Sequence, residues 1–152
     1  MTEIDAMAQL EAALYDLLST DAVLTDSGDP AYCGGGFWNR VLPDDGDKVY
    51  PFLVFSLTTS NEFRTFGKVY RYQYLYYVRV VDEAGSIDRA TQVLARVNAL
   101  LQFAHQNPGD VPMTNFDLFY SARQGRITSS PVLMGVPYQN AIDSYRVEVA
   151  PK

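Results

Sequence analysis

A run of fourteen residues, 69–82, limits the fold of this chain more than any other segment. Successive residues of a strand point to opposite faces of a sheet, so even and odd positions can be read separately. The even positions from 70 to 80 are all apolar or aromatic: Tyr70, Tyr72, Tyr74, Tyr76, Val78 and Val80. The odd positions are polar at Arg71 and Gln73, apolar at Leu75 and Tyr77, and polar again at Arg79. The pattern predicts a strand covered along one whole face, and because strands usually have about five or six residues, we expect part of it to project beyond the domain.

Two other segments carry apolar residues at the spacing of an amphipathic helix. The first follows Thr2, a residue type that is favoured as an N-cap, and is predicted to end near residues 19–20. The second follows Ser86, which we expect to cap it, and ends at about Gln102. Each helix therefore offers one apolar stripe for packing against a sheet.

The remaining strands are predicted from apolar runs and from alternation. Residues 51–58 are a continuous apolar run that starts at a proline, which a strand tolerates in its first position. Residues 59–68 are predicted to be the loop of an antiparallel hairpin, longer than a tight turn requires. Alternating side chains predict strands at 115–124 and 144–149. Residues 37–41 are interpreted as a short strand or an anchor, and 124–138 as a loop in which 132–134 can pair briefly.

This order of elements predicts one α+β domain over residues 1–152. We expect a mostly antiparallel sheet, two amphipathic helices packed on one face, and a long projecting β-hairpin. Residues 25–49 are rich in Gly, Pro and Asp, so they are predicted to form a long irregular connection.

Composition excludes several classes of protein. The net charge of −6 argues against a nucleic-acid binder held by phosphate neutralisation, which usually carries a basic patch. One cysteine excludes an internal disulfide framework. The sequence contains no signal-like segment and no apolar run near the roughly 18 residues of a membrane span. We therefore expect a soluble protein made inside the cell, with no membrane contact.

The sequence contains no motif that predicts a catalytic, cofactor-binding or metal-binding site. His105, the single histidine, is interpreted as a residue of the last turn of the second helix, favoured there by the helix dipole. The three glycines at 34–36 lack the Lys-Ser/Thr of a phosphate loop and are interpreted as a flexible linker. The acidic residues 44–47 lack the alternating ligands of a calcium loop. Cys33 has no neighbouring base in the sequence, so we expect it to be incidental.

The aromatic residues of the long strand divide into two groups. Tyr74 and Tyr76, with the valines that follow, are predicted to be core beneath the helices. Tyr70 and Tyr72 lie nearer the hairpin tip and, together with Phe63 and Phe66, predict an exposed aromatic patch. Such a patch usually marks contact with a partner.

The order of the segments also resembles a known family. The segments that carry the resemblance are residues 10–18 with 21–24, 39–43, 50–55, the hairpin, the helix that begins at Ser86, and 145–147. This order is similar to that of the tail-completion, or tail-terminator, proteins of long-tailed bacteriophages and gene-transfer agents. The resemblance extends over about residues 8–149.

The resemblance implies a structural virion protein rather than an enzyme. Members form a ring, commonly of six copies, that caps the tail tube, stops its growth and docks to the head connector. The implied partners are further copies of the chain, the tail tube protein and the head-completion protein, with DNA passing through the lumen without sequence readout. The implied location is the tail or neck of a virion assembled in the host cytoplasm. The candidate contact residues are Phe63, Arg64, Phe66, Lys68, Tyr70 and Tyr72.

Two alternatives stay open at the level of sequence. A head-completion or stopper protein, one ring nearer the capsid, has no sequence feature that separates it from a terminator. A small-molecule-binding α+β domain is the other alternative, and it predicts a deep pocket lined by the tyrosines at 70–76.

Overall fold

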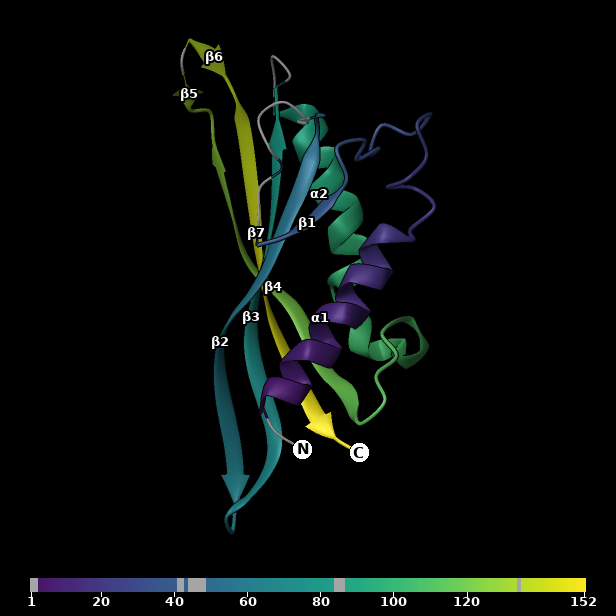
Figure 1. Cartoon of the computed structure of the whole chain (residues 1–152), viewed down its shortest axis with the longest axis vertical. Helices are drawn as coiled ribbons and strands as arrows, with labels where there is room; N and C mark the ends of the chain where they lie inside the picture. The colour runs from purple at the N-terminus through teal and green to yellow at the C-terminus, as the bar shows by residue number, and fades with distance from the viewer. Residues whose placement is uncertain (1–2, 41–42, 44–48, 84–86, 134) are drawn as a thin grey trace.

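The computed structural model describes residues 3–40, 43, 49–83, 87–133 and 135–152. Its elements in chain order are α1 (Glu3–Ser19), β1 (Phe37–Asn39), β2 (Phe52–Thr65), β3 (Lys68–Asp82), α2 (Asp88–Leu101), the 3-10 turns η2 (Ala104–Gln106) and η3 (Pro108–Asp110), β4 (Phe116–Ser129), β5 (Val132–Leu133), β6 (Val136–Pro137) and β7 (Gln139–Pro151). Five strands form one sheet in the order β1-β2-β3-β7-β4. Among the strands that the structure describes, β1 and β2 are the one parallel pair. Both helices lie on one side of the sheet (Figure 1), which confirms the α+β prediction.

The core lies between the helices and the even face of β3, as the alternation predicted. Tyr74, Tyr76, Val78 and Val80 are each at most 1% exposed. Leucines of α1 and the valines of α2 cover them, and Tyr145 of β7 lies beside Tyr76 in the register. Burying each large side chain contributes about 2 kcal/mol, an upper figure because unfolded chains are partly compact.

An ion pair ties α2 to the segment that follows α1. Arg96 of α2 donates two hydrogen bonds to the carboxylate of Asp21, from Nε at 2.9 Å and from Nη2 at 2.6 Å. The same carboxylate also accepts the backbone N–H of Leu24, 3.1 Å from Oδ2. The Arg96 guanidinium holds the pKa of Asp21 below its usual range, against the opposing effect of burial.

The predicted hairpin loop at 59–68 is wrong. β2 continues to Thr65 and β3 begins at Lys68, so Phe66 and Gly67 alone make the turn. Polar residues of this part of β2, such as Asn61 opposite Gln73, pair in register with β3. Backbone pairing with β3, rather than burial of an apolar face, forms this part of the strand, so apolar alternation could not reveal it.

The last third of the chain also has longer strands than predicted. β4 runs to Ser129 and β7 covers residues 139–151, so the first six residues of the predicted loop 124–138 belong to β4. β5 and β6 form a small antiparallel ribbon, which agrees with the brief pairing expected at 132–134, although Met134 lies outside the described residues. This end projects opposite to the turn between β2 and β3 (Figure 1).

Buried ion pairs interrupt the expected pattern. Asp143 of β7 is fully buried on the helix-covered face and accepts hydrogen bonds from Arg126 of β4, at 2.7 Å from Nε and 2.9 Å from Nη2. Asp82 at the end of β3 is also fully buried and is paired with Arg89 of α2. A charged residue at a core position breaks the apolar alternation by which a strand is predicted. Its burial is possible because a partner of opposite charge, distant in the sequence, pairs with it.

The interpretation of the three glycines as a flexible linker is wrong. The Gly35 N–H donates to the carbonyl of Pro51 at 2.8 Å, and the Gly35 carbonyl accepts from Trp38 Nε1 at 2.9 Å. A Cβ on Gly35 would lie 1.9 Å from the carbonyl oxygen of Val49. The glycine therefore allows a close backbone approach that pins residues 33–38 to the start of β2.

Some predictions concern residues outside the described part of the chain. The proposed N-cap Thr2, the acidic residues 44–47 and Ser86 lie there. α2 begins at Asp88 with Ile87 in the N-cap position, and Ile87 makes no side-chain capping hydrogen bond.

Candidate assembly interface

The arm, defined here as residues 61–71, is the part of the hairpin that extends beyond the helices (Figure 1). It consists of the end of β2, the turn, and the beginning of β3. Its most exposed aromatic side chains are Phe66, at 103%, and Tyr70, at 47%. Arg64 and Lys68 are also exposed, and Arg64 pairs with Glu62 of the same strand, with 2.9 Å between Nε and Oε2. The structure thus places four of the six predicted contact residues on an accessible surface.

Phe66 occupies a backbone position that does not suit it. Its φ is +51° and that of Gly67 is +77°, so both central residues of the two-residue turn are left-handed. Such turns favour Asn-Gly or Gly-Gly, and a bulky residue in this region costs on the order of 1–3 kcal/mol. A strained backbone and a fully exposed phenyl ring do not help the chain to fold. Within the protomer, the Phe66 ring is therefore fully open to solvent.

Phe63 and Arg71 stack on each other across the two strands of the arm. The Arg71 guanidinium carbon lies 4.2 Å from the centre of the Phe63 ring and 5.2 Å from that of Phe119. Arg71 Nη1 also lies 3.7 Å from Glu148 Oε2. Phe63 is therefore half-buried in a stack at the base of the arm, where a cation–π contact contributes about 0.5–1 kcal/mol.

Sequence reasoning missed two members of this stack. The alternation places Arg71 on the polar part of the odd face of its strand and predicts no contact for it. Phe119, which is 53% exposed, sits between Leu118 and Tyr120, where the β4–β7 register shifts. An arginine opposite an aromatic residue in a hairpin suggests a cation–π contact, so the pair of Phe63 and Arg71 could have been predicted from a correct register. The sequence gives no comparable indication for Phe119.

Tyr72 does not belong to the exposed set, and its predicted place there is wrong. It is 3% exposed, and its ring meets that of Phe116 edge to face, with 6.1 Å between centres. β7 runs beside β3 as far as the Tyr72–Val149 pair, and β4 lies next to β7, so cover extends further along β3 than the helices alone provide.

His105 is not in the last turn of α2. That helix ends at Leu101, Phe103 adopts a left-handed φ of +56°, and His105 lies in η2. Its Nδ1 accepts the backbone N–H of Ser121 at 3.2 Å, and its ring stacks on Tyr120 with 5.5 Å between centres. The imidazole thus closes part of the outer edge of β4.

The other candidate for reactivity, Cys33, is buried. Burial, with a smaller contribution from the charge of Asp82, raises the pKa of the Cys33 thiol to about 12. In the described residues, no three or more His, Cys, Asp or Glu side chains are grouped so that they could hold a metal ion. No helix in the described part of the chain is long and apolar enough to cross a membrane.

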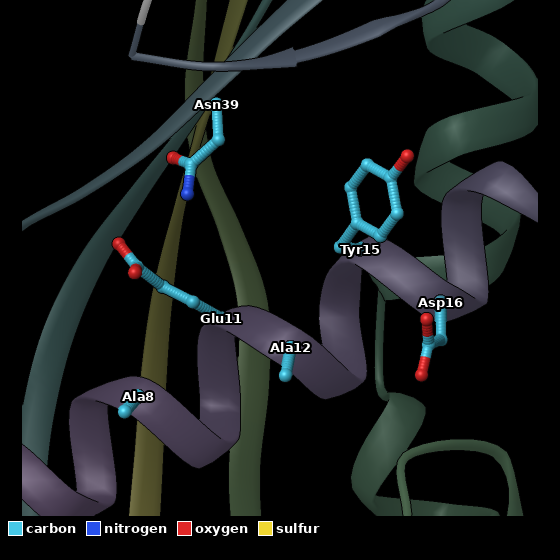
Figure 2. A pocket seen from close by; sticks show the side chains of 6 residues that line it. All are labelled: Ala8, Glu11, Ala12, Tyr15, Asp16 and Asn39. Carbon is cyan, nitrogen blue, oxygen red and sulfur yellow. The ribbon is translucent and has the colours of Figure 1, made fainter.

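The aromatic pocket required by the small-molecule alternative is not formed by the tyrosines at 70–76. Tyr72, Tyr74 and Tyr76 fill the space between sheet and helices. A depression of about 350 Å³ lies instead between α1 and the edge strand β1 (Figure 2). It is lined by Ala8, Glu11, Ala12, Tyr15, Asp16 and Asn39.

Comparison with known proteins adds a likeness in fold. No protein-family model and no curated protein matches the chain. A chain from the virion of a native gene transfer agent particle matches with a TM-score of 0.66 and 14% identity, over 99% of each chain. The two chains share a fold. A second solved structure matches with a TM-score of 0.52 and 17% identity, over 97% of this chain and 96% of its own.

Proposed function

We propose that this protein is a structural component of a tailed-phage or gene-transfer-agent virion, and that it forms the tail-terminator ring. The observation that carries the proposal is the full-length likeness in fold to a chain of a gene-transfer-agent virion. The order of segments in the sequence independently resembles the tail-terminator family. In this role the protein is not an enzyme and needs no cofactor.

The arm supports this role. Phe66, Tyr70, Arg64 and Lys68 combine exposed aromatic rings with cationic groups, a composition typical of the energetically dominant residues in protein interfaces. A subunit that caps a tube contacts its neighbours and the last tube ring, and the arm is the candidate for either contact. Commonly six copies close such a ring.

The charge of the chain is compatible with DNA passage. At a net charge of −6, a ring of this subunit does not retain a polyanion through non-specific phosphate contacts. The partners in this proposal are further copies of the chain, the tail tube protein and the head-completion protein. The ring sits at the neck of a virion assembled in the host cytoplasm.

The test is a reconstitution followed by imaging. Purified protein is expected to form rings alone or on tubes of the tail tube protein, as measured by light scattering and electron microscopy. Density for this chain against the last tube ring supports a terminator, whereas density only on the head side supports a stopper. A protein that stays monomeric and does not bind the tube would contradict the proposal.

A further inference from the structure

The face of the sheet opposite the helices, called the open face here, is not covered by any helix that the structure describes (Figure 1). Side chains at alternate positions of β3 and β7 lie on it, each of them half-buried: Arg71, Gln73, Leu75, Tyr77, Arg79, Ile142, Ser144 and Arg146. Because the centre of this face is apolar, leaving it in contact with water is unfavourable.

The open face has the composition of an interface. Leu75, Tyr77 and Ile142 form its centre, and arginines surround them. Arg79 donates to Asn140 Oδ1, at 3.2 Å from Nε and 3.1 Å from Nη2. Tyrosine and arginine around an apolar centre are the residues most often found at energetic hot spots.

The arginines give this face a positive charge within an acidic protein. Glu148, the acid that lies beside them, is already near Arg71. Arg146 packs over the Tyr120 ring, with its guanidinium carbon 4.6 Å from the ring centre, and has no carboxylate partner among the described residues. The Nε atoms of Arg71 and Arg146 are buried without a hydrogen-bond partner in the described structure.

The N-terminal quarter of the chain has the opposite charge. The first 40 residues contain seven acids and one Arg; Glu11 is paired with that Arg40 and Asp21 with Arg96 of α2. Asp16 is exposed on the outer side of α1, beside the exposed small residues Ala8 and Ala12 and the 42% exposed Tyr15 (Figure 2). The small residues leave α1 with a shallow surface that another layer can approach closely.

We propose that the open face of one copy receives the outer side of α1 from the next copy. Charge complementarity favours this occupant over an unrelated one, because basic and acidic surfaces lie on opposite sides of the same subunit. A contact between two different surfaces of one chain is heterologous, and it closes into a ring when the rotation permits. This inference rests on the proposed function, since it names the surfaces that join ring subunits.

A pair of charge reversals tests it at low salt, where such contacts are least screened. Asp16→Lys disables the α1 surface and Arg146→Glu disables the open face. Each variant alone is expected to assemble at least tenfold more weakly than wild type by sedimentation. An equimolar mixture is expected to reassemble, because the two unchanged surfaces meet at one contact and the two reversed residues, again of opposite charge, meet at the next.

Two controls make the outcome decisive. Asp26→Lys reverses an exposed acid that belongs neither to α1 nor to the sheet, and it is expected to assemble normally. Arg79→Glu replaces Arg146→Glu if circular dichroism shows that the latter does not fold.

If each variant assembles like wild type, or if the mixture does not reassemble, the inference is overturned while the ring itself stands. A wild-type chain that neither self-associates nor binds tubes would instead overturn the proposed function.

Discussion

Replacing Phe66 by Asn is expected to change folding and assembly in opposite directions. Asn followed by Gly67 is the preferred pair for a turn whose two central residues both have positive φ. The substitution also removes the exposed phenyl ring at the tip of the arm. The isolated subunit should therefore become more stable, while its association becomes weaker.

The magnitudes follow from the geometry. A bulky residue in the left-handed region costs about 1–3 kcal/mol, and Asn tolerates that region, so a gain of about 1 kcal/mol in unfolding free energy is expected. For a chain of 152 residues this raises the Tm by roughly 2–4 °C. Phe66 is fully exposed in the protomer, so burying its ring in a contact contributes about 2 kcal/mol. Losing that contribution weakens each contact roughly 30-fold.

Differential scanning calorimetry at low concentration measures the first effect, and sedimentation velocity over a concentration series measures the second. Phe66→Tyr is the matched control, because it keeps both the aromatic ring and the unfavourable φ. It should leave the Tm and the association unchanged. A fall in Tm on Phe66→Asn would show that the ring supports the fold, and unchanged association would show that the arm tip makes no contact.

Three further predictions concern the protomer. The pKa of Asp21 is held below its ordinary 3.8, so the stability that its ion pair with Arg96 contributes is present above that value and lost as the pH falls. The difference in unfolding free energy between wild type and Asp21→Asn should accordingly be full above about pH 5 and shrink below about pH 4 in urea titrations. Cys33, with its pKa raised to about 12, should resist iodoacetamide at pH 8 until the protein is unfolded, as read by mass spectrometry, and fast labelling of the native protein would contradict its burial. Gly35→Ala should cost about 3 kcal/mol or more because of the 1.9 Å approach to Val49, whereas Gly125→Ala, which meets nothing within 4 Å, should change stability by less than about 0.5 kcal/mol.

The alternation in residues 69–82 was sufficient to predict which face of β3 is core. Every even residue from Tyr74 to Val80 is buried, because helix and strand periodicities record local amphipathicity directly. Tyr72 was misplaced because its cover includes Phe116, which is distant in the sequence. The pattern of one strand shows which side chains are apolar. It does not show how far along the strand the neighbouring strands and helices cover them.

The features of the fold and of the arm that could not be predicted depend on contacts of charged residues with partners distant in the sequence. Asp143 breaks the apolar alternation of β7 and is nonetheless fully buried, because Arg126 of the neighbouring strand neutralises it. Arg71 acquires its place from Phe63 and Phe119 on two other strands. In each case the partner is identified only once the strand order is known.

The position of β7 has a consequence for when the protein becomes ready to assemble. It is the last strand along the chain, yet it lies between β3 and β4, so these two strands are joined only after β7 is inserted. Until then β3, which carries one side of the arm, has an unpaired edge and lacks the residues that cover Tyr72 and Tyr76 on that side. Closing such a long-range pairing is a late event in folding. The strand order therefore couples a finished fold to a correctly presented arm.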